Sequence, residues 1–591
     1  MILIRTNSLS ADESDVEAST HPWSRTGRSP RLAGELLLAC GMIPTPGKDY
    51  DAIVIGSGSG GLTAALALAR AGKRVALFEQ HAHLGGYTQS FTLGGFTFSP
   101  GVHYIGGLEP GGTLRRIYEG LGIANDLVFF ELNPEGYDHA LIGRERFDIP
   151  KGKRRFAERL KDRFPAERAG IDGYLDAIER MGNEIGSALP VEGLWDAALL
   201  PLRMPTVFRH GLGSLARLLD HYTEDPLLRA ILSIQAGDHG MAPSRAPAVL
   251  HAAVASYYLE GACYPRGGAR SIADAMVAGI RAAGGAVHAS TAVDAIVIAD
   301  GRARGVRLAN GTEVCADIVI SNADPGVTWG RLVAPEHVGH RIRRRLARLR
   351  YSVSTLSLFL AVDMDLRAAG LDSGNCWFNR TTDVEAPYDF GARTDLTRVD
   401  RVPGLFLNVT TLKDPTLRHD GKHTVEAICL ASYDAFAAWK DSTPGHRPPA
   451  YRALKERLAA QMLDAIEQFV PGLRDRIVLR ALGTPLTNRR YLAATRGAIY
   501  GIEKTLFNLG PLAFPIRSHV PGLYQCGAST LAAGILGVTT SGLVAAAAAL
   551  GVEREELLDA TGQTLRIHSA EDPRDWPPAW RDQPGRMRSE P

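Results

Sequence analysis

The sequence predicts an α/β protein whose parallel sheet and covering helices are joined to a second, α+β structural unit. At 591 residues the chain is too long for one compact core, so two units with additional tails are expected. Near the N-terminus, an Ile/Val-rich strand (51–55), an Ala/Leu-rich helix and a second strand (74–78) follow one another. Similar strand and helix patterns return after about residue 263 and again at residue 522. A parallel sheet assembled from separate segments accounts for this order.

A glycine-rich turn lies between the first strand and the first helix. Gly56, Gly58 and Gly61 fit the spacing G-x-G-x-x-G, and Glu79 follows Gly61 by 18 residues at the end of the second strand. These glycines allow a tight turn, a close approach to a diphosphate and close packing of helix on strand, while the acid accepts the ribose hydroxyls. A lone glycine motif is weak evidence for nucleotide binding in a chain with 63 glycines. The alternative is an ordinary strand-turn-helix that binds no nucleotide. The flanking strand, helix and acid favour a Rossmann-type domain that binds a dinucleotide.

Two later blocks continue this domain. The first combines a helix at 271–282, a strand at 286–288, a hairpin around Asp300-Gly301 and a buried strand at 317–321. The second has a strand at 522–528, a glycine turn at 534–537 and a helix whose positive end could face a cofactor ring. No second G-x-G-x-x-G is present in either block. We therefore predict a discontinuous domain comprising 49–105, 263–335 and 485–555.

The remaining segments, 106–262 and 336–484, are assigned to a substrate domain. Residues 114–219 are mainly helical in pattern. Residues 341–480 alternate strand-like runs with a helix at 451–469, which predicts an antiparallel sheet with helices on one face. The strand-like runs are 354–362, 404–411 and 424–431.

Composition restricts the partners and the compartment. The net charge of +2 points to neither nucleic acid nor an acidic partner. Six scattered cysteines without a C-x-x-C pair argue against a disulfide framework or a zinc site, and for a reducing, cytoplasmic compartment. Polar, proline-bearing ends predict a flexible N-terminal extension (1–48) and a flexible C-terminal tail (556–591).

Two stretches raise the question of membrane contact. Residues 531–550 carry no charge over 20 residues, as a transmembrane helix would, but their Gly, Thr, Ser and Ala content favours a buried helix. Residues 194–219 mix large apolar side chains with arginines, a composition that can rest in a bilayer interface. Packing of this segment on its own domain is the preferred interpretation, and peripheral membrane contact is the alternative.

The motifs carry a family resemblance from Asp49 to Gly551. The opening motif together with GFTFSPGVHYIGG resembles the flavin-dependent phytoene desaturase, carotenoid isomerase and retinol saturase family, whose FAD domain is amine oxidase- and glutathione reductase-like. Three further stretches resemble the retinol saturase branch most. They are GDHGMAPSRAPAVLHAAVASYYLEGACYPRGGARSI (237–272), GTPLTNRRYLAATRGAIYG (483–501) and GLYQCGASTLAAGILGVTTSGLVAAAAAL (522–550).

The resemblance implies FAD as the cofactor and assigns positions around it. The diphosphate, ribose, flavin and adenine contacts would come from Gly56, Gly58, Gly61, Glu79, Gly85, Gly86, Val293, Gly527, Ala528, Val538 and Thr539. This chain departs from many relatives in having Ala528-Ser529 where they place Asp or Gln-Asp, although some bacterial desaturases also have a small residue there. The departure weakens the assignment to one branch and leaves FAD binding intact. NAD(P) is then expected only as a transient electron donor, or not at all.

The expected chemistry is flavin-mediated hydride transfer on a C=C bond of a long apolar polyene or lipid. Saturation needs a proton as well as a hydride, and His103, Tyr104 and Tyr500 are the candidate donors, each with a purely structural alternative. Reduction of a retinoid or a related isoprenoid is the first hypothesis. Desaturation or cis–trans isomerisation of a carotenoid is the rival reaction. A flavin-carrying lipid-binding protein is the alternative from another class.

Overall fold

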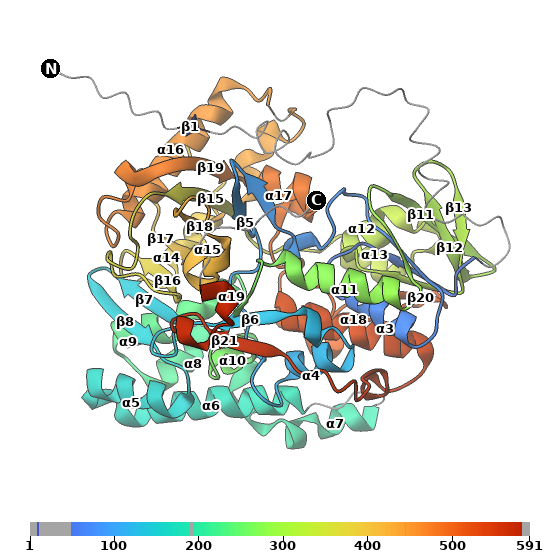
Figure 1. Cartoon of the computed structure of the whole chain (residues 1–591). Helices are drawn as coiled ribbons and strands as arrows, with labels where there is room; N and C mark the ends of the chain where they lie inside the picture. Colours follow the sequence, from blue (N-terminus) through green and yellow to red (C-terminus); the bar gives the residue numbers. More distant parts are fainter. Residues whose placement is uncertain (1–8, 11–48, 188–193, 444, 582–591) are drawn as a thin grey trace.

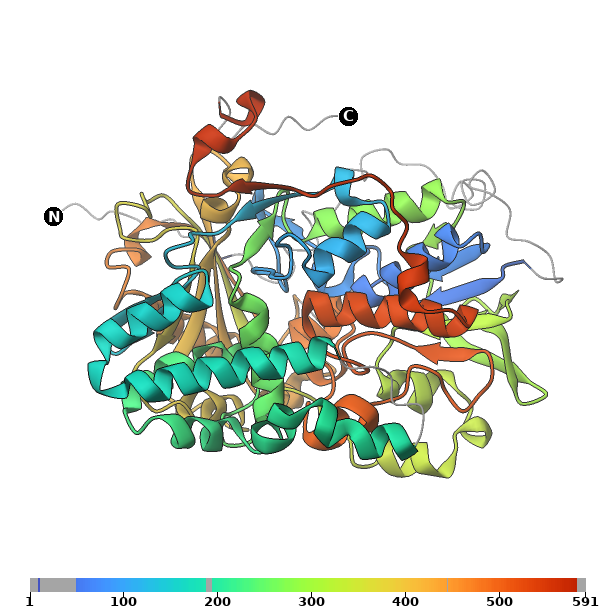
Figure 2. The ribbon, with the colours of Figure 1, turned by 90° about the horizontal axis from the view of Figure 1, so that it is seen from below.

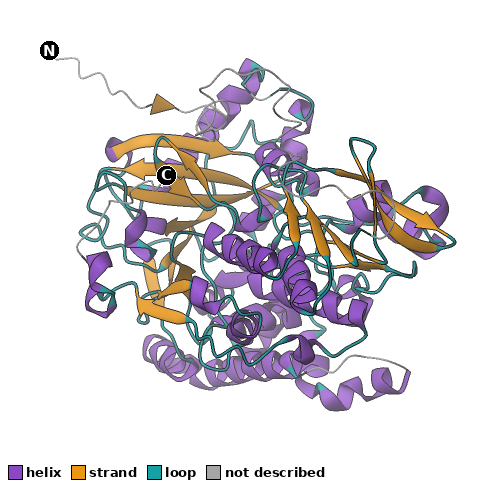
Figure 3. Cartoon of the chain, turned by 45° about the vertical axis from the view of Figure 1, so that its right-hand side comes forward, coloured by secondary structure: helices purple, strands orange, loops and turns teal. Residues whose placement is uncertain are grey.

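The computed structural model describes residues 9–10, 49–187, 194–443 and 445–581. Two large sheets dominate it, a parallel one and a larger mixed one, with helices packed between and below them (Figure 3). The predicted fold class is confirmed: an α/β domain is joined to an α+β domain (Figure 1).

The parallel sheet has five strands in the order β10-β3-β2-β14-β20. Its central strands are runs of Ile, Val, Ala and Leu that are buried on both faces, as expected for a sheet covered on two sides. The strands come from three segments far apart in the chain: β2 (Ala52–Ile55), β3 (Val75–Phe78), β10 (Ala286–His288), β14 (Ile318–Ser321) and β20 (Leu523–Gln525).

Three helices pack closely around this sheet: α3 (Ser59–Arg70), α11 (Arg270–Ala282) and α18 (Gly534–Leu550). A Cβ atom on Gly542 of α18 would overlap the carbonyl oxygen of Gly60, so the two helix backbones approach directly. The uncharged stretch 531–550 thus forms a helix that packs on protein, as its small residues favour. None of the described helices is both long and apolar enough to cross a bilayer.

A separate antiparallel meander follows β10. Its strands are β11 (Val293–Ala299), β12 (Arg302–Leu308) and β13 (Glu313–Cys315). The tight turn between β11 and β12 requires positive φ at Asp300 (50°) and Gly301 (70°), which Asp and Gly tolerate. Strands β10 and β14 of this block join the parallel sheet, whereas β11–β13 form a sheet of their own, which the sequence did not separate.

The larger sheet has eight strands in the order β1-β19-β15-β18-β17-β16-β7-β8. Helix α16 (Pro449–Ile466) packs on one face, and the helices of the 153–258 region pack near the other. The strands are β1 (Leu9–Ser10), β19 (Ile477–Gly483), β15 (Ser354–Val362), β18 (His423–Ala431), β17 (Gly404–Val409), β16 (Asn375–Asn379), β7 (Asp138–Ile142) and β8 (Glu145–Ile149). The remainder of the predicted extension 1–48 lies outside the described residues.

The helices of the substrate domain form a layer beside this sheet (Figure 2). They are α5 (Lys153–Arg163), α6 (Arg168–Gly186), α7 (Leu194–Arg203), α8 (Leu215–Tyr222), α9 (Pro226–Leu232) and α10 (Ala248–Tyr258). Shorter helices are α4 (Thr113–Gly120), α12 (Pro325–Val327), α13 (His340–Leu346), α14 (Ala386–Gly391), α15 (Thr410–Lys413) and α17 (Pro485–Tyr491). A two-stranded hairpin, β4 (Phe91–Leu93) and β5 (Phe96–Phe98), follows the first βαβ unit.

Residues 556–581 differ from the flexible tail that the sequence suggests. Strand β21 (Arg566–Ser569) pairs in parallel with β6 (Val128–Glu131), which pairs with β9 (Cys263–Pro265), and helix α19 (Pro578–Arg581) follows (Figure 2). Trp576 is buried against Phe130 with ring centroids 5.4 Å apart. The average composition of the tail is polar, but this one large aromatic ring gives it an apolar anchor.

Candidate active site

A continuous cavity of about 920 Å³ extends from the glycine loop after β2 to one face of the eight-stranded sheet. Its volume lies in the range of cofactor and small-molecule sites. The nucleotide-side lining comes from the parallel-sheet domain, and the opposite wall is apolar and aromatic. That wall includes Tyr87, Ile234, Trp377, Tyr388, Leu405, Phe406, Ile428, Leu430, Tyr491, Leu492, Ile499 and Tyr500.

Side chains at the three motif glycines of the loop would be strained or would overlap their neighbours. Gly56 has a φ of +91°, and a Cβ atom on Gly61 would overlap the Gly56 carbonyl oxygen. A Cβ on Gly58 would lie 2.8 Å from the Asn322 amide nitrogen, which follows β14. The N-terminal turn of α3 lines the cavity, and the buried Ser59 hydroxyl there has no hydrogen-bond partner among the described residues. Free helix N–H groups, the helix dipole and this hydroxyl fit a diphosphate.

Glu79 lines the same cavity and is buried at the end of β3. Its Oε2 accepts hydrogen bonds from the Ser57 backbone N–H (2.9 Å) and the Ser57 hydroxyl (2.7 Å), and its Oε1 accepts one from the His81 N–H (2.9 Å). A carboxylate has about four acceptor positions, so capacity remains for ribose hydroxyls. The Ser57 hydroxyl also accepts a hydrogen bond from the Gly85 N–H at 3.1 Å. Glu79, Ser57 and Gly85 are therefore held in one hydrogen-bond network.

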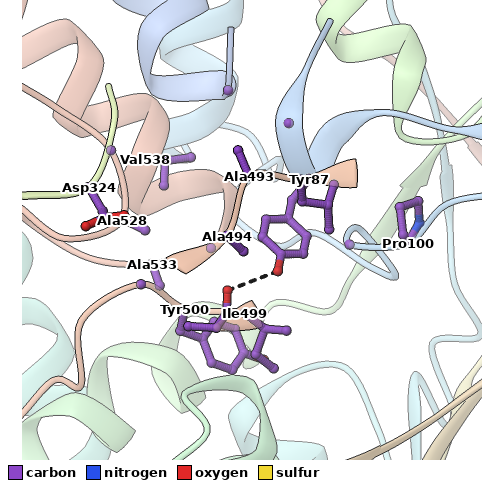
Figure 4. Close-up of a pocket in the computed structure, with 18 of the residues that line it drawn as sticks. Tyr87, Pro100, Asp324, Ala493, Ala494, Ile499, Tyr500, Ala528, Ala533 and Val538 are labelled. Carbon is purple, nitrogen blue, oxygen red and sulfur yellow. Dashed lines mark hydrogen bonds between the residues drawn. The ribbon is translucent and has the colours of Figure 1, made fainter. Parts of the chain in front are cut away.

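The other predicted cofactor positions fall around the cavity with one exception. Gly85, Gly86, Val293, Gly527, Ala528 and Val538 line it, and Figure 4 shows Val538 near Ala528. A Cβ on Gly86 would lie 3.2 Å from the Gly58 Cα atom, so the Gly85-Gly86 pair packs on the glycine loop after β2. Thr539 does not line the cavity; it is fully buried on α18, because the next residue of a helix faces about 100° away.

The three predicted proton donors differ in position. His103 lines the cavity, with its Nδ1 atom 3.2 Å from both the Asn408 amide nitrogen and a Glu426 carboxylate oxygen. Tyr500 lines it too, and its hydroxyl donates to the Gly237 carbonyl at 3.0 Å. Tyr104 is buried behind the wall, stacked on Tyr258 with ring centroids 4.3 Å apart. Tyr104 therefore does not face the cavity directly.

A row of apolar side chains forms the sheet side of the wall. Trp377 on β16 is paired with Phe406 on β17, and Phe406 with Ile428 on β18, so all three side chains share one face. The Trp377 and Phe406 rings meet edge to face with centroids 4.6 Å apart. Sequence reasoning did not find this row, because it depends on strand register rather than on a local pattern.

Asp238 is a second residue that sequence reasoning missed. It lines the cavity at the end of a short helical turn (Ile234–Asp238), and Tyr104 donates a hydrogen bond to its Oδ2 atom at 2.5 Å. The motif Gly237-Asp238-His239-Gly240 offered a signal, since a lone carboxylate between glycines in an apolar region needs a reason. The fully buried Asp138 lies close behind, with Tyr104 within 3.4 Å of its Oδ2.

Comparison with known proteins gives this site its family. Residues 59–550 match the family described as "Flavin containing amine oxidoreductase". The chain belongs to this flavin-dependent amine oxidoreductase family. It is an FAD-dependent oxidoreductase, as the glycine motif and the resemblance predict.

Several curated relatives match most of the chain. All-trans-retinol 13,14-reductase of Danio rerio is 32% identical over 529 residues, covering 84% of this chain and 85% of the relative. The Homo sapiens protein of the same name is 30% identical, covering 85% and 86%. Prolycopene isomerase of Arabidopsis thaliana is 28% identical, covering 86% and 84%. The predicted resemblance to the retinol saturase and carotenoid isomerase family is confirmed.

Solved structures agree in fold. An oxidoreductase from Methanosarcina mazei superposes with a TM-score of 0.56 at 19% identity, covering 83% of this chain and 99% of its own. Cyclohexylamine oxidase from Brevibacterium oxydans gives a TM-score of 0.56 at 17% identity, covering 86% and 99%. At these identities the comparison supports the two-domain architecture alone.

Proposed function

We propose that this protein reduces a C=C bond of a long apolar polyene, a retinoid or a related isoprenoid. The continuity of this cavity carries the proposal, because it joins the glycine loop to an aromatic wall without interruption. The match to retinol 13,14-reductases over most of both chains favours reduction over the other reactions of the family.

The residues of the glycine loop fit FAD and support one orientation for it. Gly56, Gly58 and the start of α3 would hold the diphosphate, and Glu79 the adenosine ribose. Val293 would contact the adenine, and Gly85 and Gly86 the linker to the flavin. When bound, FAD supplies hydride chemistry that no side chain can supply.

The wall beyond the flavin side fits a rigid apolar substrate. The Trp377–Phe406–Ile428 row gives a flat apolar surface, and Tyr388 and Tyr500 line the same space. Contact with such a surface removes a conjugated chain from water, which contributes roughly 25 cal/mol per Å² of apolar area. The wall would thereby align one double bond with the cofactor and exclude water around it.

A single-turnover experiment tests the reaction. The holoenzyme is reduced anaerobically with dithionite, freed of excess reductant and mixed with retinol, a carotenoid or an unsaturated fatty acid. We expect the flavin to reoxidise with the polyene and the product to gain two hydrogen atoms by mass spectrometry. A product of unchanged mass and altered geometry would instead indicate isomerisation. In a parallel reaction with oxidised enzyme, a product that has lost two hydrogen atoms would indicate desaturation. A flavin inert to every lipid would indicate a binding protein.

Isomerisation is the second candidate, because prolycopene isomerases also match most of the chain. Both reactions need the same cofactor loop and the same apolar wall. They differ in the need for a proton donor at the substrate, since isomerisation leaves the hydrogen count unchanged.

We also propose peripheral contact with an anionic membrane surface through residues 199–212. This segment, which spans the end of α7 and the turn before α8, exposes Leu199, Leu202, Phe208 and Leu212 by 40%, 79%, 40% and 46%. Arg203 and Arg209 are exposed among them. Apolar side chains beside arginines suit a headgroup interface, where an apolar substrate would be concentrated.

A further inference from the structure

Asp238 presents a carboxyl group to the cavity with only one of its oxygens engaged. Tyr104 donates to Oδ2 at 2.5 Å. In the part of the chain that the structure describes, Oδ1 has no hydrogen-bond partner. The backbone here is packed tightly: a Cβ on Gly237 would overlap the Trp377 ring, and Tyr500 donates to the Gly237 carbonyl at 3.0 Å. The position of Asp238 is therefore fixed by the aromatic wall itself.

Asp138 is the second carboxyl group of this cluster and is fully buried. It accepts hydrogen bonds from Gln235 (2.9 Å), Asn375 (2.8 Å) and the Trp377 indole N–H (3.1 Å). Burial raises the pKa of Asp138 to about 6, while these donors and the nearby Lys413 ammonium oppose the rise. Donors that stabilise the ionised form make Asp138 the group of the pair that holds the negative charge.

Asp238 has the opposite environment. Burial raises the pKa of Asp238 well above its usual range, the charge of Asp138 adds to the rise, and the single hydrogen bond from Tyr104 opposes it. Besides Asp138 and Tyr104, four further titratable groups lie near Asp238. They are Tyr137, Tyr258, Tyr388 and Tyr500. None of these groups is a cation, so among the described neighbours only the hydrogen bond from Tyr104 favours the carboxylate. Two carboxyls in unequal surroundings separate into a base and an acid.

We propose that Asp238 is the proton donor of the reduction, with Tyr104 and Asp138 as positioning residues behind it. This inference rests on the proposed function. Bound FAD, in its two-electron-reduced form, would supply a hydride to one substrate carbon, and the other carbon accepts the proton as the O–H bond of Asp238 breaks. The double bond thus gains H⁻ and H⁺ and becomes a single bond. The Tyr104 hydroxyl stabilises the carboxylate left on Asp238, which takes up a proton from water once the product has gone.

The donors predicted from the sequence are less suitable for this step. Burial raises the pKa of both Tyr104 and Tyr500 well above the ordinary value for tyrosine, so each holds its proton tightly. Proton transfer is efficient when the donor pKa lies near the working pH, and burial raises the pKa of the Asp238 carboxyl in that direction. His103 is engaged at Nδ1 by Asn408 and Glu426.

The test compares Asp238→Asn with wild type and with Asp389→Asn, which makes the same change on an exposed carboxyl of α14. Infrared spectra of the oxidised protein at neutral pH supply a readout that does not depend on activity. We expect a protonated-carboxyl band that shifts in D₂O, is lost in Asp238→Asn and is retained in Asp389→Asn. Absence of any band that depends on Asp238 overturns the proposal. Flavin content and circular dichroism check that each variant is folded and loaded.

Anaerobic single turnovers then measure the chemical step. We expect Asp238→Asn to slow flavin reoxidation by the polyene by about 100-fold or more, and Asp238→Glu to recover part of the rate. Wild-type rates should fall at high pH, and that fall should vanish in Asp238→Asn. If wild type reduces the substrate and Asp238→Asn does so equally fast, the inference alone fails. If wild type reduces nothing, the proposed function fails, and the infrared band still reports on Asp238.

A rival role for Asp238 is to bind the hydroxyl end of an alcohol substrate. That role predicts a raised KM for retinol in Asp238→Asn, an unchanged kcat, and unchanged reduction of a polyene hydrocarbon. This result would overturn the proposal. Loss of kcat with both the alcohol and the hydrocarbon supports it, because proton supply is needed whatever the end group is.

Discussion

Glu79 accepts two hydrogen bonds from Ser57, from its backbone N–H at 2.9 Å and from its hydroxyl at 2.7 Å. This contact ties the end of β3 to the glycine loop after β2. Glu79, which we propose binds the ribose, and the glycine loop, which we propose binds the diphosphate, are thus held in one arrangement.

Replacing Glu79 with Ala should therefore weaken FAD binding by about 10- to 100-fold, or ~1.4–2.8 kcal/mol, which is the range for hydrogen bonds to a charged group. Fluorescence titration of the apoprotein with FAD measures the effect. Glu313→Ala changes an exposed glutamate on β13 and should leave the affinity unchanged. Equal affinity in the two variants would place the adenosine ribose elsewhere.

Gly542→Ala should destabilise the parallel-sheet domain, because the added methyl group would overlap the Gly60 carbonyl and push α18 away from α3. Overpacking of this kind costs about 1–3 kcal/mol. A lowered Tm together with lower flavin content is the expected result, since α3 begins at the proposed diphosphate site. Gly186→Ala is the matched control: nothing lies within 4 Å of its added Cβ, and α6 should gain up to about 1 kcal/mol.

The sequence predicts the first βαβ unit well because strand, glycine turn, helix and acid are all local signals. The same reasoning locates β15 and β18 to within a residue, and most of the predicted cofactor residues line the cavity. Local patterns also give the small-residue stretch 531–550, which the structure places in a packed helix.

The substrate side of the site depends on contacts that no local pattern shows. Trp377 and Phe406 share a face only through the register of β16 with β17. Asp238 and Asp138 meet through Tyr104, and each comes from a different part of the chain. The prediction that residues 556–591 form a flexible tail misses β21 for a related reason, since an average composition cannot show that Trp576 packs on Phe130.

The stability of the substrate domain should fall as pH rises above about 6.5. Burial opposes the charged form of His139, but the Asp148 and Asp372 carboxylates, at 2.6 and 2.9 Å, outweigh it and raise the His139 pKa to about 9. A raised folded-state pKa gives stability that is complete below the unfolded value, near 6.5, and is lost as pH passes through about 9.

His139→Gln should remove this dependence at a cost on the order of 2 kcal/mol near pH 6. Urea unfolding at a series of pH values measures it. His340→Gln alters an exposed histidine and should keep the wild-type slope between pH 6.5 and 9. If the stability of His139→Gln falls between pH 6.5 and 9 as steeply as that of wild type, other groups produce the pH dependence.

Leu202→Asp should reduce binding to vesicles of phosphatidylcholine and phosphatidylserine about tenfold or more, because a side chain that is 79% exposed would no longer enter the apolar layer. Co-sedimentation with vesicles measures the bound fraction. Wild-type binding should also weaken with added salt, since Arg203 and Arg209 contribute electrostatic attraction. Val552→Asp places the same charge on an exposed apolar position outside residues 199–212 and should bind like wild type. Equal loss in both variants would contradict a specific surface.

Trp576→Ala should destabilise the protein by about 3 kcal/mol, the ordinary cost of removing a buried aromatic side chain. The indole packs on Phe130 and donates a hydrogen bond to the Ser569 carbonyl at 2.6 Å, so it fastens β21 against β6. Denaturant unfolding gives the stability, and limited proteolysis should cut first after residue 560 in the variant. Phe507→Ala removes an aromatic ring that is 79% exposed and should change stability by less than about 0.5 kcal/mol. If both variants match wild type in stability and cleavage, the tail is free in solution and β21 contributes nothing to the fold.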